Sequence, residues 1–161
     1  MRKRGKPRKR GPLTNTLIVV GESTKPLDRH GDYLVDLRIR NHAAMASLVK
    51  GSANTEEFRT LLGASNVTQA ACQLKLGAEY QQVADAGQTA LYHIALRAQD
   101  LGRYVCKAEE INALNLMLEL HDAQLDTMTV RDIERAIETA KAMMQDPKKV
   151  VHLPKRATHP T

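Results

Sequence analysis

The sequence predicts an all-α protein with one five-helix, bundle-like domain, and three observations support this fold class. With one Phe and no Trp in 161 residues, the core must consist of Leu, Ile, Val, Ala and Met, which suits packed helices better than strands. Apolar residues recur at helical spacing in several segments. The segment Lys107–Asp126 is also apolar around most of its circumference, which predicts a central helix in contact with several neighbours.

The first two helices are predicted from their apolar stripes and their end signals. One spans about 32–50 and ends at Gly51, which suits a left-handed C-terminal cap. The next begins at Asn54, where Glu57 three residues later completes a capping box, and it ends at Gly77. Gly63 lies inside this second helix and predicts a kink or a close contact with another helix.

The third predicted helix spans about 78–101 and ends at Gly102. Its long stripe is apolar, and the small residues in it would let a neighbouring helix approach closely. The stripe consists of Tyr80, Val83, Gly87, Leu91, Ile94, Ala98 and Leu101, flanked by Ala84 and Ala90.

The last two predicted helices form a helical hairpin or a sharp corner, because their connection is very short. The central helix carries Glu109 and Glu110 in its first turn, where the helix dipole favours negative charge. Thr129 is the predicted N-cap of the final helix, Asp132 follows three residues later, and Pro147 ends the helix. Its predicted inner face consists of Val130, Ile133, Ala136, Ile137, Ala140 and Met144.

Charge is divided unevenly along the chain. Residues 1–10 hold seven Lys or Arg, residues 147–161 hold four, and neither segment contains Asp or Glu. Residues 11–146 hold 13 basic and all 18 acidic residues, a net charge of −5. The predicted organisation is a disordered basic tail at 1–12, an irregular arm at 13–31, a helical domain at 32–146 and a basic C-terminal tail at 147–161.

Basic arms on an acidic body are typical of proteins that bind a polyanion. The leading hypothesis is a non-enzymatic nucleic-acid-binding protein, with DNA as the expected ligand and low sequence selectivity, because the tail has no aromatic residue to stack on bases. Alternatives are an acidic protein partner or no specific role, and a homodimer is possible. The predicted nucleic-acid-binding residues are Arg2, Lys3, Arg4, Lys6, Arg8, Lys9, Arg10, Lys148, Lys149, Lys155 and Arg156.

The apolar run Leu17–Val20 within the arm has two interpretations. It lies over a groove of the helical body, or it adds a strand to a partner or anchors one. The second interpretation, with the acidic body, leads to an alternative function: an inhibitor or adaptor that binds a host protein complex.

Other motifs favour structural roles, and we expect no catalytic residue, no metal and no cofactor. Leu17–Pro26 lacks the second Gly and the Lys-Ser/Thr order of a phosphate loop. Glu119, His121, Asp122 and Asp126 could hold a divalent cation, but no second helix offers matching ligands, so a solvated face is expected. His93 is expected to be a partly buried polar residue.

The last two helices could be read as a helix-turn-helix. Against this, the turn lacks Gly, and the final helix presents Asp132, Glu134 and Glu138 beside its cations, whereas a recognition helix normally shows donors to DNA.

Cys72 and Cys106 fit no metal spacing, and we expect both to be buried thiols in a reducing compartment. No signal peptide and no membrane-spanning segment are predicted, which favours a soluble cytoplasmic protein.

Three stretches resemble a group of small helical proteins encoded by phages, prophages and plasmids of proteobacteria, some labelled Fis-type DNA-binding regulators. They are MRKRGKPRKR, HGDYLVDLRIRNHAAMASLVKG and LGRYVCKAEEINALNLMLELHDAQLDTMTVRDIERAIE. The resemblance implies an accessory protein of a mobile element, and it assigns no functional residue.

Overall fold

The structure is a computed structural model that describes residues 31–146. In that range it contains five α-helices, which confirms the predicted all-α fold. They are α2 (Gly31–Val49), α3 (Thr55–Gln73), α4 (Gln81–Leu101), α5 (Ala108–Thr127) and α6 (Val130–Gln145), and the 3-10 turn η2 (Ala78–Tyr80) precedes α4. The basic tail at 1–12, nearly all of the arm, the C-terminal tail and the predicted stop at Pro147 lie outside the described residues.

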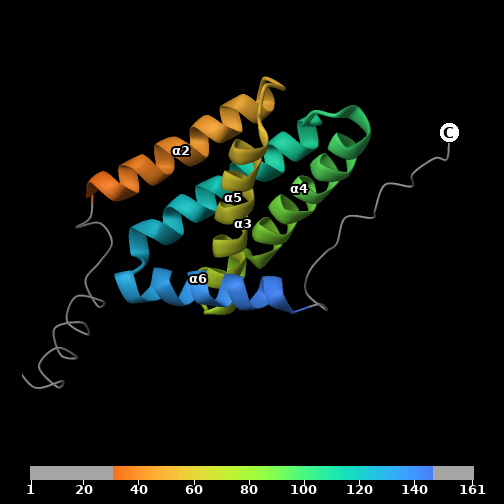
Figure 1. The fold of residues 1–161 in the computed structure, drawn as a ribbon. Coiled ribbons are helices and arrows are strands. Elements are labelled where there is room, and N and C mark those ends of the chain that lie inside the picture. Colours follow the sequence, from red (N-terminus) through yellow and green to blue (C-terminus); the bar gives the residue numbers. More distant parts are fainter. Residues whose placement is uncertain (1–30, 147–161) are drawn as a thin grey trace, which may run out of the picture.

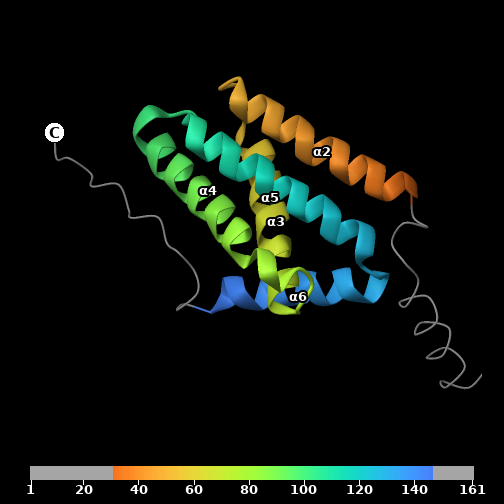
Figure 2. The same ribbon diagram turned by 180° about the vertical axis from the view of Figure 1, so that it is seen from behind.

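Three helices form a layer that a fourth crosses. In both Figure 1 and Figure 2, α2, α5 and α4 lie side by side with α5 in the middle, and α3 runs across them at a steep angle. The last helix, α6, lies across one end of α3. The layer positions α2 at one edge of the molecule, with no other described helix beyond it.

The predicted central helix, α5, does pack against α2, α3 and α4, but α3 packs against all four of the other helices. Because α3 crosses the layer, it can reach neighbours that a helix within the layer cannot. The prediction that α5 contacts several neighbours is confirmed, but its outward side is open: Leu116 is 53 % exposed and Ala123 is also exposed.

Two apolar clusters make up most of the core. The larger lies between α2, α3, α4 and α5, and it centres on residues such as Leu48, Leu61 and Leu118 that are fully buried. Phe58 stacks on Tyr104 at this end, with 4.2 Å between ring centroids. The second cluster joins α6 to the ends of α2, α3 and α5.

Local end signals predicted several helix boundaries correctly. Asn54 accepts a hydrogen bond from the backbone N–H of Glu57, whose carboxylate accepts one from the N–H of Asn54. Thr129 and Asp132 form the same reciprocal pair at the start of α6. Both Gly51 and Gly102 have positive φ, as the predicted C-terminal caps require.

The predicted boundary at Gly77 is wrong. Helix α3 ends at Gln73, because Lys75 adopts a left-handed φ of 70° and its N–H bonds the carbonyl of Cys72. Gly77, also left-handed, instead precedes η2, so the predicted helix 78–101 begins as a 3-10 turn before α4. Two left-handed residues, Lys75 and Gly77, therefore lie in this short connection. The apolar pattern of the sequence does not mark either change of backbone direction.

The glycines within helices behave differently from one another. Gly63 is exposed, and nothing lies within 4 Å of a Cβ built on it, so the predicted close contact is absent there. At Gly87 a Cβ would lie 2.6 Å from Cβ and Cγ of Met117. The expectation that small residues let α4 approach a neighbour closely is therefore confirmed, and the neighbour is α5.

Several residues that were predicted to face the core are exposed. Tyr80 and Leu101 on the α4 stripe, and Met144 on α6, are each more than half exposed, and Ile137 is 37 % exposed. His93, expected to be partly buried, is exposed as well. Helices at the edge of the fold bury narrower stripes than an apolar pattern indicates; α6 fully buries only Ala136 and Ala140.

Candidate functional site

The predicted nucleic-acid-binding residues all lie outside the described residues, in 1–30 and 147–161. The described part of the chain therefore does not test whether they lie together. Within residues 31–146, polar and ionisable side chains form three clusters between helices. Between α4 and α5 there is also one apolar groove.

The first cluster joins α2 to α5 and contains two of the predicted acidic residues. Arg38 makes an ion pair with Asp126 and donates a 3.1 Å hydrogen bond to the backbone carbonyl of Asp122. His42 Nε2 lies 2.8 Å from Asp122 Oδ2. These contacts tie Asp122 and Asp126 to Arg38 and His42 of α2, and Glu119 stays exposed without joining them.

This cluster therefore connects helices and does not resemble a metal centre. Among residues 31–146 no group of three or more His, Cys, Asp or Glu side chains is arranged to hold a metal ion. The expectation of a solvated face holds for Glu119 and Asp126 but is wrong for His121, which is 3 % exposed.

The second cluster places His121 against α3. The Thr68 hydroxyl donates to the carbonyl of Ala64 at 2.9 Å and lies 3.0 Å from His121 Nδ1. A hydroxyl has a single proton, so Thr68 accepts a hydrogen bond from Nδ1–H of the neutral imidazole. Burial lowers the pKa of His121 to about 4, because the charged ring cannot be hydrated there.

The third cluster lies between α3, η2, α4 and α5. Gln69 and Gln81 both donate to Asp85 Oδ1, at 2.7 and 2.9 Å, and Gln81 also donates to Gln69 Oε1. The side chain of Gln124 donates to the carbonyl of Leu76 at 2.9 Å. The cluster thereby holds the irregular connection between α3 and α4 in place.

The two cysteines are free thiols, but only Cys72 is buried; Cys106 is half-buried, which corrects the expectation for it. Cys72 donates to the carbonyl of Gly77 at 3.3 Å. Burial raises the pKa of both thiols, that of Cys106 to about 11. Neither thiol is activated for nucleophilic attack at neutral pH.

An apolar groove of about 160 Å³ opens between α4 and α5, on the face that exposes Leu116. Ala113 and Leu116 line it from α5, and Gln82, Val83 and Ala86 line it from α4. Its volume is well below the roughly 300–1,000 Å³ of a small-molecule site. The groove has room for one or two apolar side chains of a protein, and pattern analysis missed it because it assigned Leu116 to the core.

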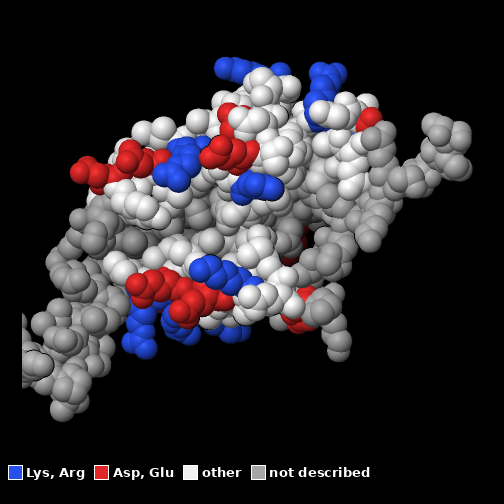
Figure 3. Space-filling view, viewed as in Figure 1, with Lys and Arg blue, Asp and Glu red and all other residues white. Residues whose placement is uncertain are grey.

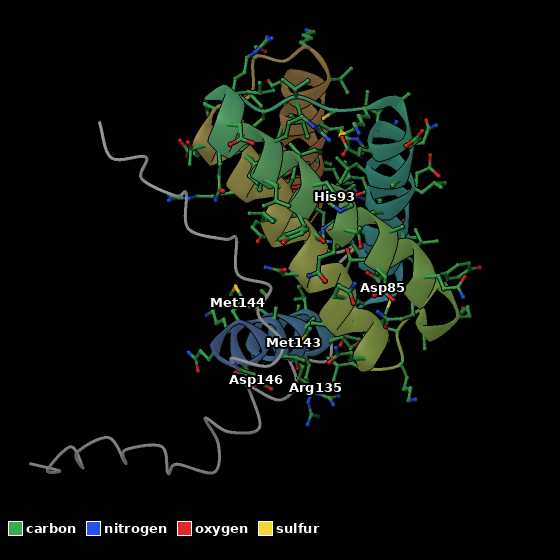
Figure 4. All side chains as sticks on the ribbon, turned by 90° about the vertical axis from the view of Figure 1, so that its right-hand side faces the viewer. Asp85, His93, Arg135, Met143, Met144 and Asp146 are labelled. Carbon is green, nitrogen blue, oxygen red and sulfur yellow. The ribbon has the colours of Figure 1, made fainter. Side chains whose placement is uncertain are left out.

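Helix α6 presents a mixed surface instead of a basic one. Its exposed positions carry Arg131, Glu134, Arg135, Glu138 and Lys141. Figure 3 shows acidic and basic side chains together over this helix, and Figure 4 shows Arg135 on its outer side. Asp132, predicted to point outward, instead caps the helix through Thr129. This distribution gives no support to α6 as a DNA recognition helix.

No described helix is long and apolar enough to cross a membrane. No protein-family model matches the chain, and neither does any curated protein or solved structure.

Proposed function

We propose that this chain is a non-enzymatic, nucleic-acid-binding accessory or regulatory protein of a phage or mobile element, which contacts phosphates through residues 2–10. The observation that carries the proposal is the segregation of charge. The two terminal segments hold 11 of the 24 Lys and Arg and no acid, whereas residues 31–146 hold 11 basic and 16 acidic residues. An acidic body repels a polyanion, so attraction must come from the arms.

The contacts of the Lys and Arg side chains in residues 31–146 support the proposal that the tails, and not the body, bind phosphates. Arg38 and Arg97 are engaged in ion pairs with Asp122, Asp126 and Glu110. On the face in Figure 3, blue and red side chains are interspersed over α2 and α6. Phosphate binding by the body would place carboxylates against the ligand. Residues 2–10, by contrast, offer seven cations and contain no carboxylate side chain.

The resemblance to small proteins of phages, prophages and plasmids supports the biological context within this proposal. DNA is the favoured ligand, with low sequence selectivity, since backbone contacts carry no sequence information. The cations Lys148, Lys149, Lys155 and Arg156 assist the N-terminal tail.

Fluorescence anisotropy with labelled duplex DNA, single-stranded DNA and RNA tests the proposal. The full chain is compared with a chain that begins at Leu13, at low and at physiological salt. We expect the full chain to bind and the shortened chain to lose most of its affinity for all three ligands. Equal binding by both chains would exclude the tail as the phosphate-binding element.

The second candidate is an inhibitor or adaptor that binds a host protein, and the groove between α4 and α5 favours it. A groove with room for one or two apolar side chains beside an exposed Leu116 suits an anchor residue of a partner. A pull-down from nuclease-treated host lysate, with the full chain and with Leu116→Glu as bait, separates the candidates. A stoichiometric protein captured only by the unchanged bait supports the adaptor; empty beads count against it.

A further inference from the structure

The outer face of α2 carries an apolar stripe that no described element covers. Val35, Ile39 and Val49 are 54 %, 61 % and 49 % exposed, and Ala46 between them is exposed as well. His42 is the polar member of the row: it is exposed, and its Nε2 reaches sideways to Asp122 of α5. Their spacing alternates between four and three residues, which places all five on one side of the helix along about 21 Å. In Figure 1, α2 forms the upper edge of the molecule.

This face is distinct from the side that α2 packs on its own chain. The buried residues of α2 are Leu34, Asn41, Ala44, Met45 and Leu48, and they face α3 and α5. The two stripes lie roughly 120° apart around the helix at 3.6 residues per turn. A second apolar stripe beside a core stripe is unusual on a helix with solvent on one side, and its 3–4 spacing matches the pattern of helix pairing.

We propose that α2 pairs antiparallel with α2 of a second copy, and that the chain is a two-fold dimer. A two-fold interface requires that residue i faces residue j while j faces i. With an axis beside residues 42 and 43, Val35 faces Val49 of the other copy, and Ile39 faces its Ala46. The small side chains of Ala43 and Ala46 allow close approach near the axis.

Charge complementarity selects the same register. Asp36 and Lys50 are both exposed, lie two heptads apart on the same flank of the stripe, and make no ion pair within residues 31–146. In the antiparallel register, Asp36 of each copy faces Lys50 of the other, which forms two symmetric ion pairs. In a parallel pairing, the flank that carries Asp36 and Lys50 would instead face the opposite flank of the partner helix, so neither residue would gain this ion pair.

The dimer also sets the separation of the two N-terminal arms, a consequence that rests on the proposed function. Each α2 begins at Gly31, between eleven and twelve residues from the axis, so the two start points lie about 35 Å apart along the helix pair at a rise of 1.5 Å per residue. One turn of B-form DNA spans about 34–36 Å. The points at which the two arms join the body would thus be spaced by about one helical turn, while the arms themselves lie outside the described residues.

Sedimentation equilibrium of the full chain tests the pairing without nucleic acid, so its outcome is independent of the proposed function. We expect a mass twice the 17.9 kDa of one chain at micromolar concentration. Ile39→Glu should give a monomer, while the matched control Leu116→Glu, equally exposed on α5, should stay dimeric. A monomer for the unchanged chain at all concentrations would overturn the proposal, as would a dimer that Leu116→Glu disrupts and Ile39→Glu does not.

Charge reversal tests the register. Asp36→Lys and Lys50→Asp should each weaken the dimer at least tenfold, and the double variant should restore it at low salt. A double variant weaker than both single variants would exclude the antiparallel register. Circular dichroism of each variant confirms that the helical fold is retained.

Discussion

Nδ1 of His121 on α5 lies 3.0 Å from the hydroxyl of Thr68 on α3, inside the core and away from solvent. The ring must stay neutral there, which makes the stability of the fold depend on pH. Burial lowers the pKa of His121 from 6.5 to about 4 in the folded chain.

The pH prediction follows from this difference. Between pH 6.5 and 4 the unfolded chain binds a proton at position 121 that the folded chain does not, so acidification favours unfolding. We expect the free energy of unfolding to fall by up to about 1.4 kcal/mol per pH unit in this window, and not above pH 7. Urea denaturation of the unchanged chain and of His121→Gln, from pH 7.5 to 4, measures it. Identical pH profiles would show that His121 does not titrate differently on folding.

Replacing Gly87 or Gly63 by Ala should change the free energy of unfolding in opposite directions. Gly87→Ala should lower the free energy of unfolding by about 1–3 kcal/mol, because its Cβ would collide with Met117. Gly63→Ala, in open space on α3, should raise it by about 0.5–1 kcal/mol through the loss of glycine's backbone entropy. Thermal and urea unfolding of both variants checks the pair, and a stabilising Gly87→Ala would contradict the close contact.

We expect Glu110 to stabilise the folded chain at the start of α5. Its carboxylate accepts from both Nη atoms of Arg97, at 3.0 and 2.6 Å, and from the N–H of Lys107 at 2.7 Å. Burial alone would raise the pKa of Glu110, but these hydrogen bonds lower it on balance. Its contribution to stability is therefore present above pH 4.5 and lost as the pH falls below that value.

Glu110→Gln should cost about 1.5–3 kcal/mol at pH 7, the range for hydrogen bonds to a charged group. Glu109→Gln is the matched control, because it removes the same charge from the same helix turn at an exposed position without these partners. Equal unfolding free energies for the two variants would exclude a structural role for Glu110.

We expect the thiol of Cys106 to react slowly in the folded chain. Burial and then the charge of Glu110 raise the pKa of Cys106 to about 11, so little thiolate exists at pH 8. We expect slow reaction with a disulfide reagent under native conditions and fast reaction in urea. Rapid labelling of the folded chain would show that Cys106 is more open than the structure has it.

Local chemistry in the sequence predicted more of this fold than apolar patterning did. The capping pairs Asn54–Glu57 and Thr129–Asp132, and the glycine caps at 51 and 102, depend on neighbours within a few residues, so they can be read along the chain. The end of α3 could not, because it depends on a positive φ at Lys75, a residue with no preference for it.

Which side chains of each helix are buried depends on how the helices pack against one another. His121 and Leu116 lie five residues apart on α5, yet α3 covers the first and leaves the second exposed. Residues five apart lie on different sides of a helix, about 140° apart at 3.6 residues per turn. Which of the two sides α3 covers depends on how the helices pack, and the sequence of α5 does not contain that. The cations of the tails, by contrast, are evident from sequence alone, as is the net charge of −5 on residues 11–146. The structure adds that Arg38 and Arg97 of the body are held in ion pairs with its own carboxylates.

The salt dependence of DNA binding tests the central claim most directly. The full chain and a variant with all seven Lys and Arg of residues 2–10 changed to Gln are titrated against duplex DNA at several salt concentrations. If the tail binds phosphates, log K should fall with log salt at a slope near −6 for the full chain, about −0.9 for each of seven contacts, and much less for the variant. Equal slopes and affinities for the two chains would contradict the claim that the basic tail is the nucleic-acid-binding element.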